Sequence, residues 1–91
     1  MAKYKILIKP SATQEIESIR NKKDRQRIVR RIRILAESPR PPGCEKLSGY
    51  QNRYRIRQGV YRIVYAVEDA ALVVYVVKVG HRKEVYRKGA L

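Results

Sequence analysis

Residues 53–65 read Arg-Tyr-Arg-Ile-Arg-Gln-Gly-Val-Tyr-Arg-Ile-Val-Tyr, and this stretch decides the fold. The alternation of polar and apolar side chains predicts two strands, and Gln58-Gly59 between them predicts a two-residue hairpin turn. With that turn at the tip, Arg55 lies directly across from Arg62. Like charges placed opposite each other on neighbouring strands are destabilising. The pairing therefore indicates that something anionic binds between the two arginines.

The same register collects the apolar side chains of the hairpin on one face. Tyr54 then lies across from Ile63, and Ile56 lies across from Tyr61. Residues 3–9 alternate in the same way, which predicts a half-buried strand at the start of the chain. We expect one apolar sheet face, made by Tyr4, Ile6, Ile8, Tyr54, Ile56, Tyr61, Ile63 and Tyr65.

Two helices are predicted between the first strand and the hairpin. The first begins near Ala12, where Ser11 and Gln14 have the spacing of a capping box, and it ends around Asn21. The second covers about residues 24–37 and carries apolar side chains at helical spacing. The short link between the helices predicts an antiparallel helical hairpin. The buried side of the second helix is expected to consist of Ile28, Val29, Ile32, Leu35 and Ala36.

The element order is strand, helix, helix, strand, strand, strand. Residues 38–52 are rich in proline and glycine and are expected to be irregular. The last strands are predicted over residues 53–57, 60–67 and 72–79. The sequence predicts an α+β fold, in which residues 1–91 form one domain and a mainly antiparallel sheet is packed on one face by the helical hairpin. The other face would form a basic groove, which residues 80–87 join. Tyr75 and Val77 join it too if the turn between the last two strands preserves the alternation.

The charge of the chain points to a polyanionic partner. Its 22 lysines and arginines against 8 acidic residues give a formal charge of +14, which favours nucleic acid over other partners. The alternative is a charged surface that is merely solvated. Cys44 is the one cysteine, which excludes an intramolecular disulfide and suits a reducing cytoplasm. No signal peptide and no membrane-spanning run are expected.

The residues of the groove exclude several kinds of catalysis. The sequence has no glycine-rich phosphate loop, no metal-ligand spacing, and a single histidine, so a two-histidine ribonuclease is excluded. Glu84 is the only acid expected near the groove, so we expect no metal and no cofactor. Cleavage of RNA by attack of the RNA's 2′-hydroxyl needs neither a metal nor a cofactor. The enzyme only has to align that hydroxyl, stabilise the charge on the phosphate and move protons. Arginine suits the second task, because its fork of donors matches phosphate oxygens.

Three segments, residues 46–50, 53–65 and 79–86, resemble the RelE family of bacterial and archaeal toxins. The resemblance extends over nearly the whole chain and includes the predicted element order. It implies a toxin that binds the 70S ribosome and cuts mRNA in the decoding site by 2′-hydroxyl attack, without metal. It also implies a partner, an acidic antitoxin of the RelB type, which would form a heterodimer or heterotetramer with this chain in the cytoplasm.

The resemblance assigns roles to five residues. Arg55 and Arg57 match two basic positions of the first hairpin strand, and Arg62 would hold the scissile phosphate. Arg82 would stabilise the transition state, and Tyr86 would stack on a base and assist proton transfer. The best-known members carry lysines in place of the first two arginines, and one of those lysines is a candidate general base. Arginine keeps its proton at any working pH, so that role is in doubt for this chain.

Other residues are expected to support the reaction or to bind RNA. An unperturbed histidine titrates near pH 6.5, so His81 could transfer a proton, although a lone histidine at a strand end is often a surface or capping residue. Tyr86 could instead be a core aromatic. Arginines on the second helix could simply be solvated. The residues expected to contact RNA or the ribosome are Arg53, Lys78, Lys83, Arg87, Arg30 and Arg33.

Two other functions remain open from the sequence. A ParE-like toxin has the same fold and inhibits DNA gyrase without cutting RNA. A plain RNA-binding domain would need only the positive charge. The basic pair Arg55 and Arg57 together with Tyr86 favours the RelE type, because ParE-type chains generally lack that combination.

Overall fold

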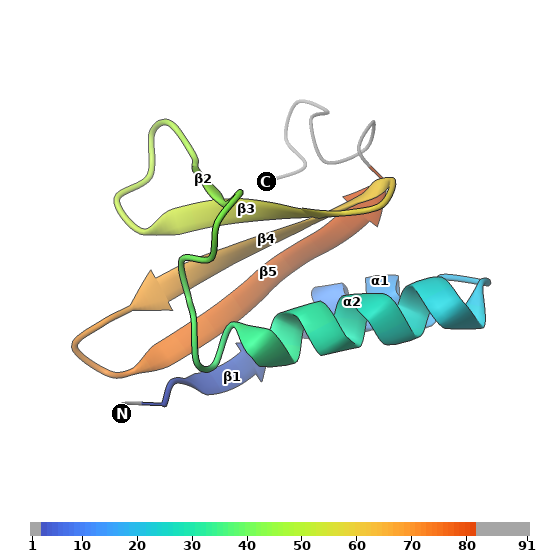
Figure 1. The fold of residues 1–91 in the computed structure, drawn as a ribbon, viewed down its shortest axis with the longest axis horizontal. Helices are drawn as coiled ribbons and strands as arrows, with labels where there is room; N and C mark the ends of the chain where they lie inside the picture. The colour runs from blue at the N-terminus through green and yellow to red at the C-terminus, as the bar shows by residue number, and fades with distance from the viewer. Residues whose placement is uncertain (1–2, 82–91) are drawn as a thin grey trace.

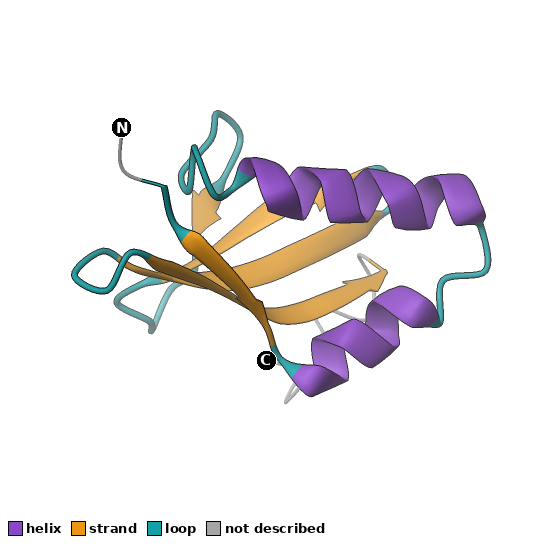
Figure 2. Cartoon of the chain, turned by 90° about the horizontal axis from the view of Figure 1, so that it is seen from below, coloured by secondary structure: helices purple, strands orange, loops and turns teal. Residues whose placement is uncertain are grey.

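Two helices lie on one side of a five-stranded sheet (Figures 1 and 2). The structure, a computed structural model, describes residues 3–81. This arrangement confirms the predicted α+β fold with a helical layer on one sheet face. In chain order the elements are β1 (Lys5–Ile8), α1 (Pro10–Glu17), α2 (Lys22–Ile34), β2 (Glu45–Lys46), β3 (Arg53–Gln58), β4 (Tyr61–Glu68) and β5 (Val73–His81).

The strands lie in the order β1-β5-β4-β3-β2. β1 runs parallel to β5, and every other neighbouring pair is antiparallel. The mainly antiparallel sheet is thus as predicted, but β2 was missed. β2 has only two residues and lies in the proline-rich segment that was expected to be irregular. It places Glu45 across from Arg55 and so brings an acidic side chain beside the hairpin.

The first helix begins earlier than predicted. Pro10 is its first residue, and Lys9 is the N-cap without a side-chain hydrogen bond. The predicted capping box at Ser11 and Gln14 is therefore wrong, because both residues lie inside the helix. Proline is favoured at this position because its fixed φ suits a helix and its missing N–H would have had no partner there.

The second helix is capped by a residue that was expected to end the first. The side chain of Asn21 accepts a hydrogen bond from the backbone N–H of Asp24, at 3.1 Å. Asparagine is a preferred N-cap because its side-chain oxygen satisfies a backbone donor that the helix leaves unpaired. The helix consequently starts at Lys22, two residues before the predicted start, and ends at Ile34, three residues before the predicted end.

The hairpin between β3 and β4 has a different register from the predicted one. Gln58 pairs with Tyr61, so Gly59 and not Gln58 is the first residue of the turn, with a φ of +62°. A glycine adopts this backbone conformation without the steric cost that other residues meet. Arg62 therefore lies across from Arg57, and the predicted pairing of Arg62 with Arg55 is wrong. The shift is two residues, so every side chain stays on its predicted face.

A β-bulge interrupts the pairing of β4 with β5. Val64 pairs with Lys78 and Tyr65 pairs with Val76, so Val77 is an extra residue on β5. Tyr75 lies across from Ala66, on the face away from the helices, as predicted. Val77 was predicted to join that face as a regular strand residue; it is instead the extra residue of the bulge, so the alternation of β5 does not decide its face.

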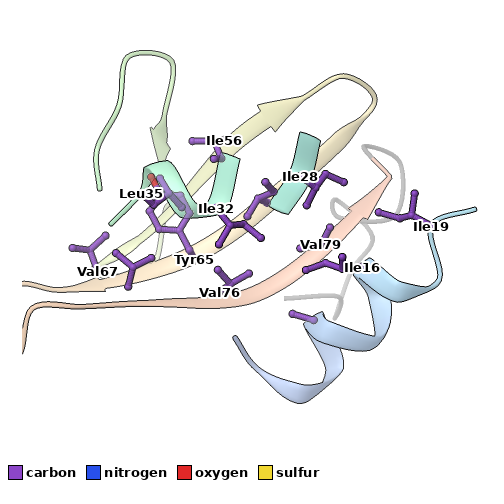
Figure 3. Packing of buried hydrophobic residues seen from close by; sticks show 13 residues of the cluster. Ile16, Ile19, Ile28, Ile32, Leu35, Ile56, Tyr65, Val67, Val76 and Val79 are labelled. Atoms are coloured by element: carbon purple, nitrogen blue, oxygen red, sulfur yellow. The ribbon is translucent and has the colours of Figure 1, made fainter. Parts of the chain in front are cut away.

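The core lies between the helices and β3, β4 and β5 (Figure 3). Ile28, Ile32 and Leu35 of α2 are directed at the sheet and are fully or almost fully buried. Each such side chain stabilises the fold by about 1.5–3 kcal/mol. Ile8, which was expected in this core, is instead 37% exposed, because it ends the edge strand just before α1 begins.

Candidate anion-binding site

A hollow of about 390 Å³ is lined by four arginines, and we call it the arginine hollow. The alternation of β3 brings Arg55 and Arg57 to the same face, and Arg62 joins them from β4. The sequence predicted that these three residues come together, and the structure shows that they do. The complete lining is Arg31, Gly43, Glu45, Arg55, Arg57 and Arg62.

Arg62 is the most buried charged side chain of the hollow, with 8% of its surface exposed. Its Nη1 atom donates to the backbone oxygen of Tyr61 at 3.0 Å and, at 3.4 Å, to that of Gly59. Within residues 3–81 neither Arg62 nor Arg57 has a carboxylate partner. A guanidinium has five N–H donors, so most of those on Arg62 are available to a ligand.

Glu45 is the acidic residue of the hollow. Its carboxylate forms an ion pair with Arg55, next to which it lies because β2 and β3 are paired. The expectation that Glu84 would be the only acid near the groove is wrong, because Glu45 lines it. The sequence did not reveal this contact, because a two-residue strand has too few residues to show an alternation.

A network of hydrogen bonds holds the segment that leads from α2 to β2. The Tyr65 hydroxyl donates to the backbone oxygen of Pro39 at 2.7 Å, and the Arg40 guanidinium binds both carboxylate oxygens of Asp69. The Tyr4 hydroxyl also donates to Asp69, at 2.6 Å. The network therefore fixes the segment that carries Gly43, a residue of the arginine hollow.

The four titratable groups of this network, Tyr4, Arg40, Tyr65 and Asp69, all have shifted pKa values, and two of the shifts bear on stability. The hydrogen bonds from Arg40 and then Tyr4 lower the pKa of the Asp69 carboxyl below its usual value, because they stabilise the charged form. The pKa of the Tyr65 hydroxyl is raised above its usual value. Burial is the largest cause, because it would deprive the phenolate of its hydration.

His81 lies away from the arginine hollow. It pairs with Tyr61, whereas Arg62 pairs with Gly80, so the side chains of His81 and Arg62 belong to opposite faces of the sheet. His81 lines a different hollow, of about 840 Å³, together with Tyr61 and residues of α1. The rings of His81 and Tyr61 meet edge to face, with centroids 6.3 Å apart. The structure therefore does not bring His81 together with the arginines, and its part in proton transfer stays a prediction.

Within residues 3–81, the other basic residues predicted to bind RNA do not line the arginine hollow. Lys78 forms an ion pair with Glu15 of α1, whose other carboxylate oxygen accepts from the backbone N–H of Val79. The Arg53 guanidinium lies over the ring of Tyr50, 4.6 Å from its centroid. Arg30 and Arg33 line a third hollow, on the helical layer. Arg82, Lys83, Glu84, Tyr86 and Arg87 lie outside the described residues.

Two general features of residues 3–81 bear on function. No group of three or more histidine, cysteine or acidic side chains there could hold a metal ion. None of the helices in that range is long and apolar enough to cross a membrane.

The arrangement of helices and sheet is that of a known toxin family. A family model described as "ParE toxin of type II toxin-antitoxin system, parDE" matches residues 6–86. The chain belongs to this family. Among curated relatives, the mRNA interferase toxin RelE of Escherichia coli strain K12 is 39% identical over 66 residues, which cover 68% of each chain. The RelE relatives make this chain a RelE-type toxin of a type II toxin–antitoxin system.

Solved structures of the family have the same fold. RelE in the archaeal RelE–RelB complex of Pyrococcus horikoshii OT3 is 28% identical, with a TM-score of 0.78, 90% of this chain covered and 97% of that chain. RelE in the intact E. coli RelBE complex is 30% identical, with a TM-score of 0.75 and coverage of 86% and 95% respectively. The family fold thus extends over most of this toxin.

Proposed function

We propose that this RelE-type toxin is an endoribonuclease that cuts mRNA in the decoding site of the ribosome and so inhibits translation. The observation that carries the proposal is the pair of opposed arginines, Arg57 and Arg62, in a hollow where neither has a carboxylate partner among the described residues. A relative that is 39% identical is named an mRNA interferase, which supports the same activity.

The proposed reaction uses the RNA as its own nucleophile. The 2′-oxygen forms a bond to the adjacent phosphorus as the bond from phosphorus to the 5′-oxygen breaks, which leaves a 2′,3′-cyclic phosphate and a free 5′-hydroxyl. One proton leaves the 2′-hydroxyl and one is added to the 5′-oxygen. No metal is needed, because the substrate supplies the nucleophile and guanidinium groups stabilise the charge that develops on the phosphate.

The residues of the arginine hollow have distinct parts in this scheme. Arg62 binds a non-bridging oxygen of the scissile phosphate, and Arg57 binds the same phosphate from the neighbouring β-strand, β3. Arg55, which is paired with Glu45, adds a further guanidinium group to the site. Arg82 and Tyr86, which the family resemblance assigns to transition-state stabilisation and base stacking, complete the site. Proton transfer is not assigned to Arg55 or Arg57, because arginine does not give up its proton at working pH.

Incubation of the purified toxin with mRNA-programmed ribosomes tests the proposal. The expected result is cleavage in the decoding site by the parent protein, and loss of cleavage in Arg62→Gln. Arg27→Gln is the matched control, because Arg27 is exposed on α2 and does not line the arginine hollow. Intact mRNA after incubation with the parent protein would contradict the proposal.

A second function is favoured by the description of the matching family model, which names ParE. Inhibition of DNA gyrase by the purified toxin, with mRNA left intact on ribosomes, would support this ParE-like function instead. RNA binding without either effect would leave a basic RNA-binding domain.

We propose that the partner is an acidic antitoxin of the RelB type and that the complex forms in the cytoplasm, where ribosomes are found. The solved relatives include RelB–RelE complexes. A groove of about 520 Å³ on the helical layer offers a surface with matching charge, because Ile16 and Val29 are surrounded by Arg25, Arg30 and Arg33. An amphipathic acidic helix would place its apolar side chains in this groove and its carboxylates on the rim.

Co-purification with the product of the neighbouring reading frame tests the partner. The expected product is acidic in its toxin-binding part and forms a heterodimer or heterotetramer with the toxin. The double variant Arg30→Glu and Arg33→Glu should weaken the complex, whereas the double variant Lys23→Glu and Arg27→Glu makes the same charge change at exposed positions that do not line the groove and should not. A neighbouring product with no net negative charge in that part would count against an acidic antitoxin.

A further inference from the structure

One guanidinium of the arginine hollow comes from the helical layer and not from the sheet. Arg31 belongs to α2, where it lies one turn after Ile28 and one turn before Leu35, both fully buried. This spacing places Arg31 beside the buried stripe of the helix. Its side chain lines the hollow together with Arg57 and Arg62. Two layers of the fold therefore contribute cations to one site.

The Arg31 side chain has a donor that the described part of the protein does not use. Its Nε atom is buried and makes no hydrogen bond within residues 3–81. The described part of the chain also gives its guanidinium no carboxylate partner. A buried donor without an acceptor is unfavourable, and so is a cation near other cations. Folding alone does not favour arginine at this position, whereas a ligand with acceptor oxygens would.

The short length of β2 explains why a helical residue can reach this site. β2 pairs only with Tyr54 and Arg55, so the rest of the β3 edge up to Gln58 has no neighbouring strand within the described residues. The chain that leaves α2 rises past the sheet to β2, as Figure 1 shows. The arginine hollow thus lies where β2 ends, between that edge and α2.

The charge of the hollow exceeds what one phosphodiester needs. Four arginines and Glu45 give it a formal charge of +3, and Glu45 is paired with Arg55. One phosphodiester carries a single negative charge and would leave the hollow at +2. The remaining positive charge favours a second phosphate of the same RNA near Arg31.

We propose that Arg31 binds a backbone phosphate of the RNA that neighbours the phosphate held by Arg57 and Arg62. The inference rests on the proposed function and extends it, because it assigns the helical layer a direct part in substrate binding. Arg31 is thus an RNA-binding residue that could not be distinguished by sequence from the other arginines of α2.

The test measures RNA binding without cleavage. The probe is a short fluorescent oligoribonucleotide with 2′-O-methyl riboses, which cannot supply the nucleophile. Its affinity for the toxin is measured by fluorescence anisotropy over a range of salt concentrations, for the parent, Arg31→Gln, Arg31→Lys and Arg27→Gln. The two glutamine variants lose the same charge from the same helix, and only Arg31 lines the hollow.

Arg31→Gln is expected to bind about tenfold more weakly than the parent, and its slope of log affinity against log salt is expected to fall by about 0.7. Arg27→Gln should stay within about twofold of the parent. Arg31→Lys should lie between, because it keeps the charge and loses the fork of donors. Circular dichroism and thermal unfolding check that every variant is folded, and removal of an unpaired buried donor should not lower stability.

The two proposals fail in different ways. Equal affinities for Arg31→Gln and Arg27→Gln, or a parent protein that does not bind the probe at low salt, would overturn the role of Arg31. Ribosomal mRNA left intact by a parent protein that binds RNA through Arg31 would contradict the nuclease function alone. In the ribosomal assay we expect Arg31→Gln to raise KM more than it lowers kcat, because the residue acts in binding.

Discussion

Arg57 and Arg62 lie directly across from each other in the ladder between β3 and β4. Opposed like charges weaken a strand pair, and no acidic side chain among residues 3–81 neutralises either of them. The protein therefore keeps an arrangement that costs stability at the place where the substrate phosphate is proposed to bind. Replacement of one of the two arginines should therefore lower the activity with little effect on the stability of the fold.

Arg62→Gln tests that separation. We expect the rate of mRNA cleavage on ribosomes to fall on the order of 10²–10³, because a preorganised donor to the phosphate is lost. The free energy of unfolding should change by less than about 1 kcal/mol, because relief of the repulsion offsets the lost hydrogen bonds to the turn. Single-turnover cleavage and urea unfolding measure the two effects. A large loss of stability would mean that Arg62 is mainly structural.

Glu45→Gln should strengthen RNA binding. The carboxylate of Glu45 forms an ion pair with Arg55, so we expect it to compete with RNA for this arginine, and its removal also raises the positive charge of the arginine hollow. We expect about two- to fivefold tighter binding of the uncleavable oligoribonucleotide at low salt. Glu17→Gln makes the same charge change on the exposed end of α1 and should have a smaller effect. Unchanged or weaker binding by Glu45→Gln would show that the carboxylate does not compete with RNA.

Tyr65→Phe should destabilise the protein by about 1 kcal/mol, because the part-buried hydrogen bond from the buried Tyr65 side chain to the Pro39 carbonyl is lost. The pKa of Tyr65 is raised by burial, so the parent should also lose stability as the pH rises above about 10, through the pKa of the folded state. The phenylalanine variant should lack that part of the loss. Urea unfolding between neutral and alkaline pH measures both effects.

Tyr54→Phe is the control for that experiment. The Tyr54 hydroxyl accepts a hydrogen bond from Arg40 on the surface, where water can replace it. Its removal should therefore cost less than the removal of the Tyr65 hydroxyl. Equal stabilities of the two variants would contradict the assigned role of the Tyr65–Pro39 hydrogen bond.

Asp69→Asn should change the acid sensitivity of the fold. The pKa of Asp69 is lowered in the folded protein, so its contribution to stability is present above the unfolded pKa of about 3.9 and is lost as the pH falls through the folded value. The parent should lose more stability than Asp69→Asn as the pH falls below about 4. Thermal unfolding across the acidic range measures the difference, with Glu17→Gln as control. Parallel curves for parent and Asp69→Asn would show that the network with Arg40 and Tyr4 is not retained in solution.

Alternation along the chain was enough to predict which side chains share a sheet face. The side-chain period of a strand is two residues, so the apolar face with Ile56 and Ile63 and the basic face with Arg57 and Arg62 were predictable. The spacing of Ile28, Ile32 and Leu35 likewise predicted the buried side of α2. The positive charge and the resemblance of residues 53–65 to RelE toxins predicted the family, which the comparisons confirm.

Only the tertiary structure decided which residues meet in the arginine hollow. A register shift of two residues leaves every side chain on its face, so alternation could not distinguish Arg57 from Arg55 as the partner of Arg62. The contributions of Arg31 and Glu45 depend on contacts between segments far apart in the chain, which no local periodicity encodes. For the same reason the sequence placed His81 beside the arginines, whereas strand pairing puts it on the opposite face.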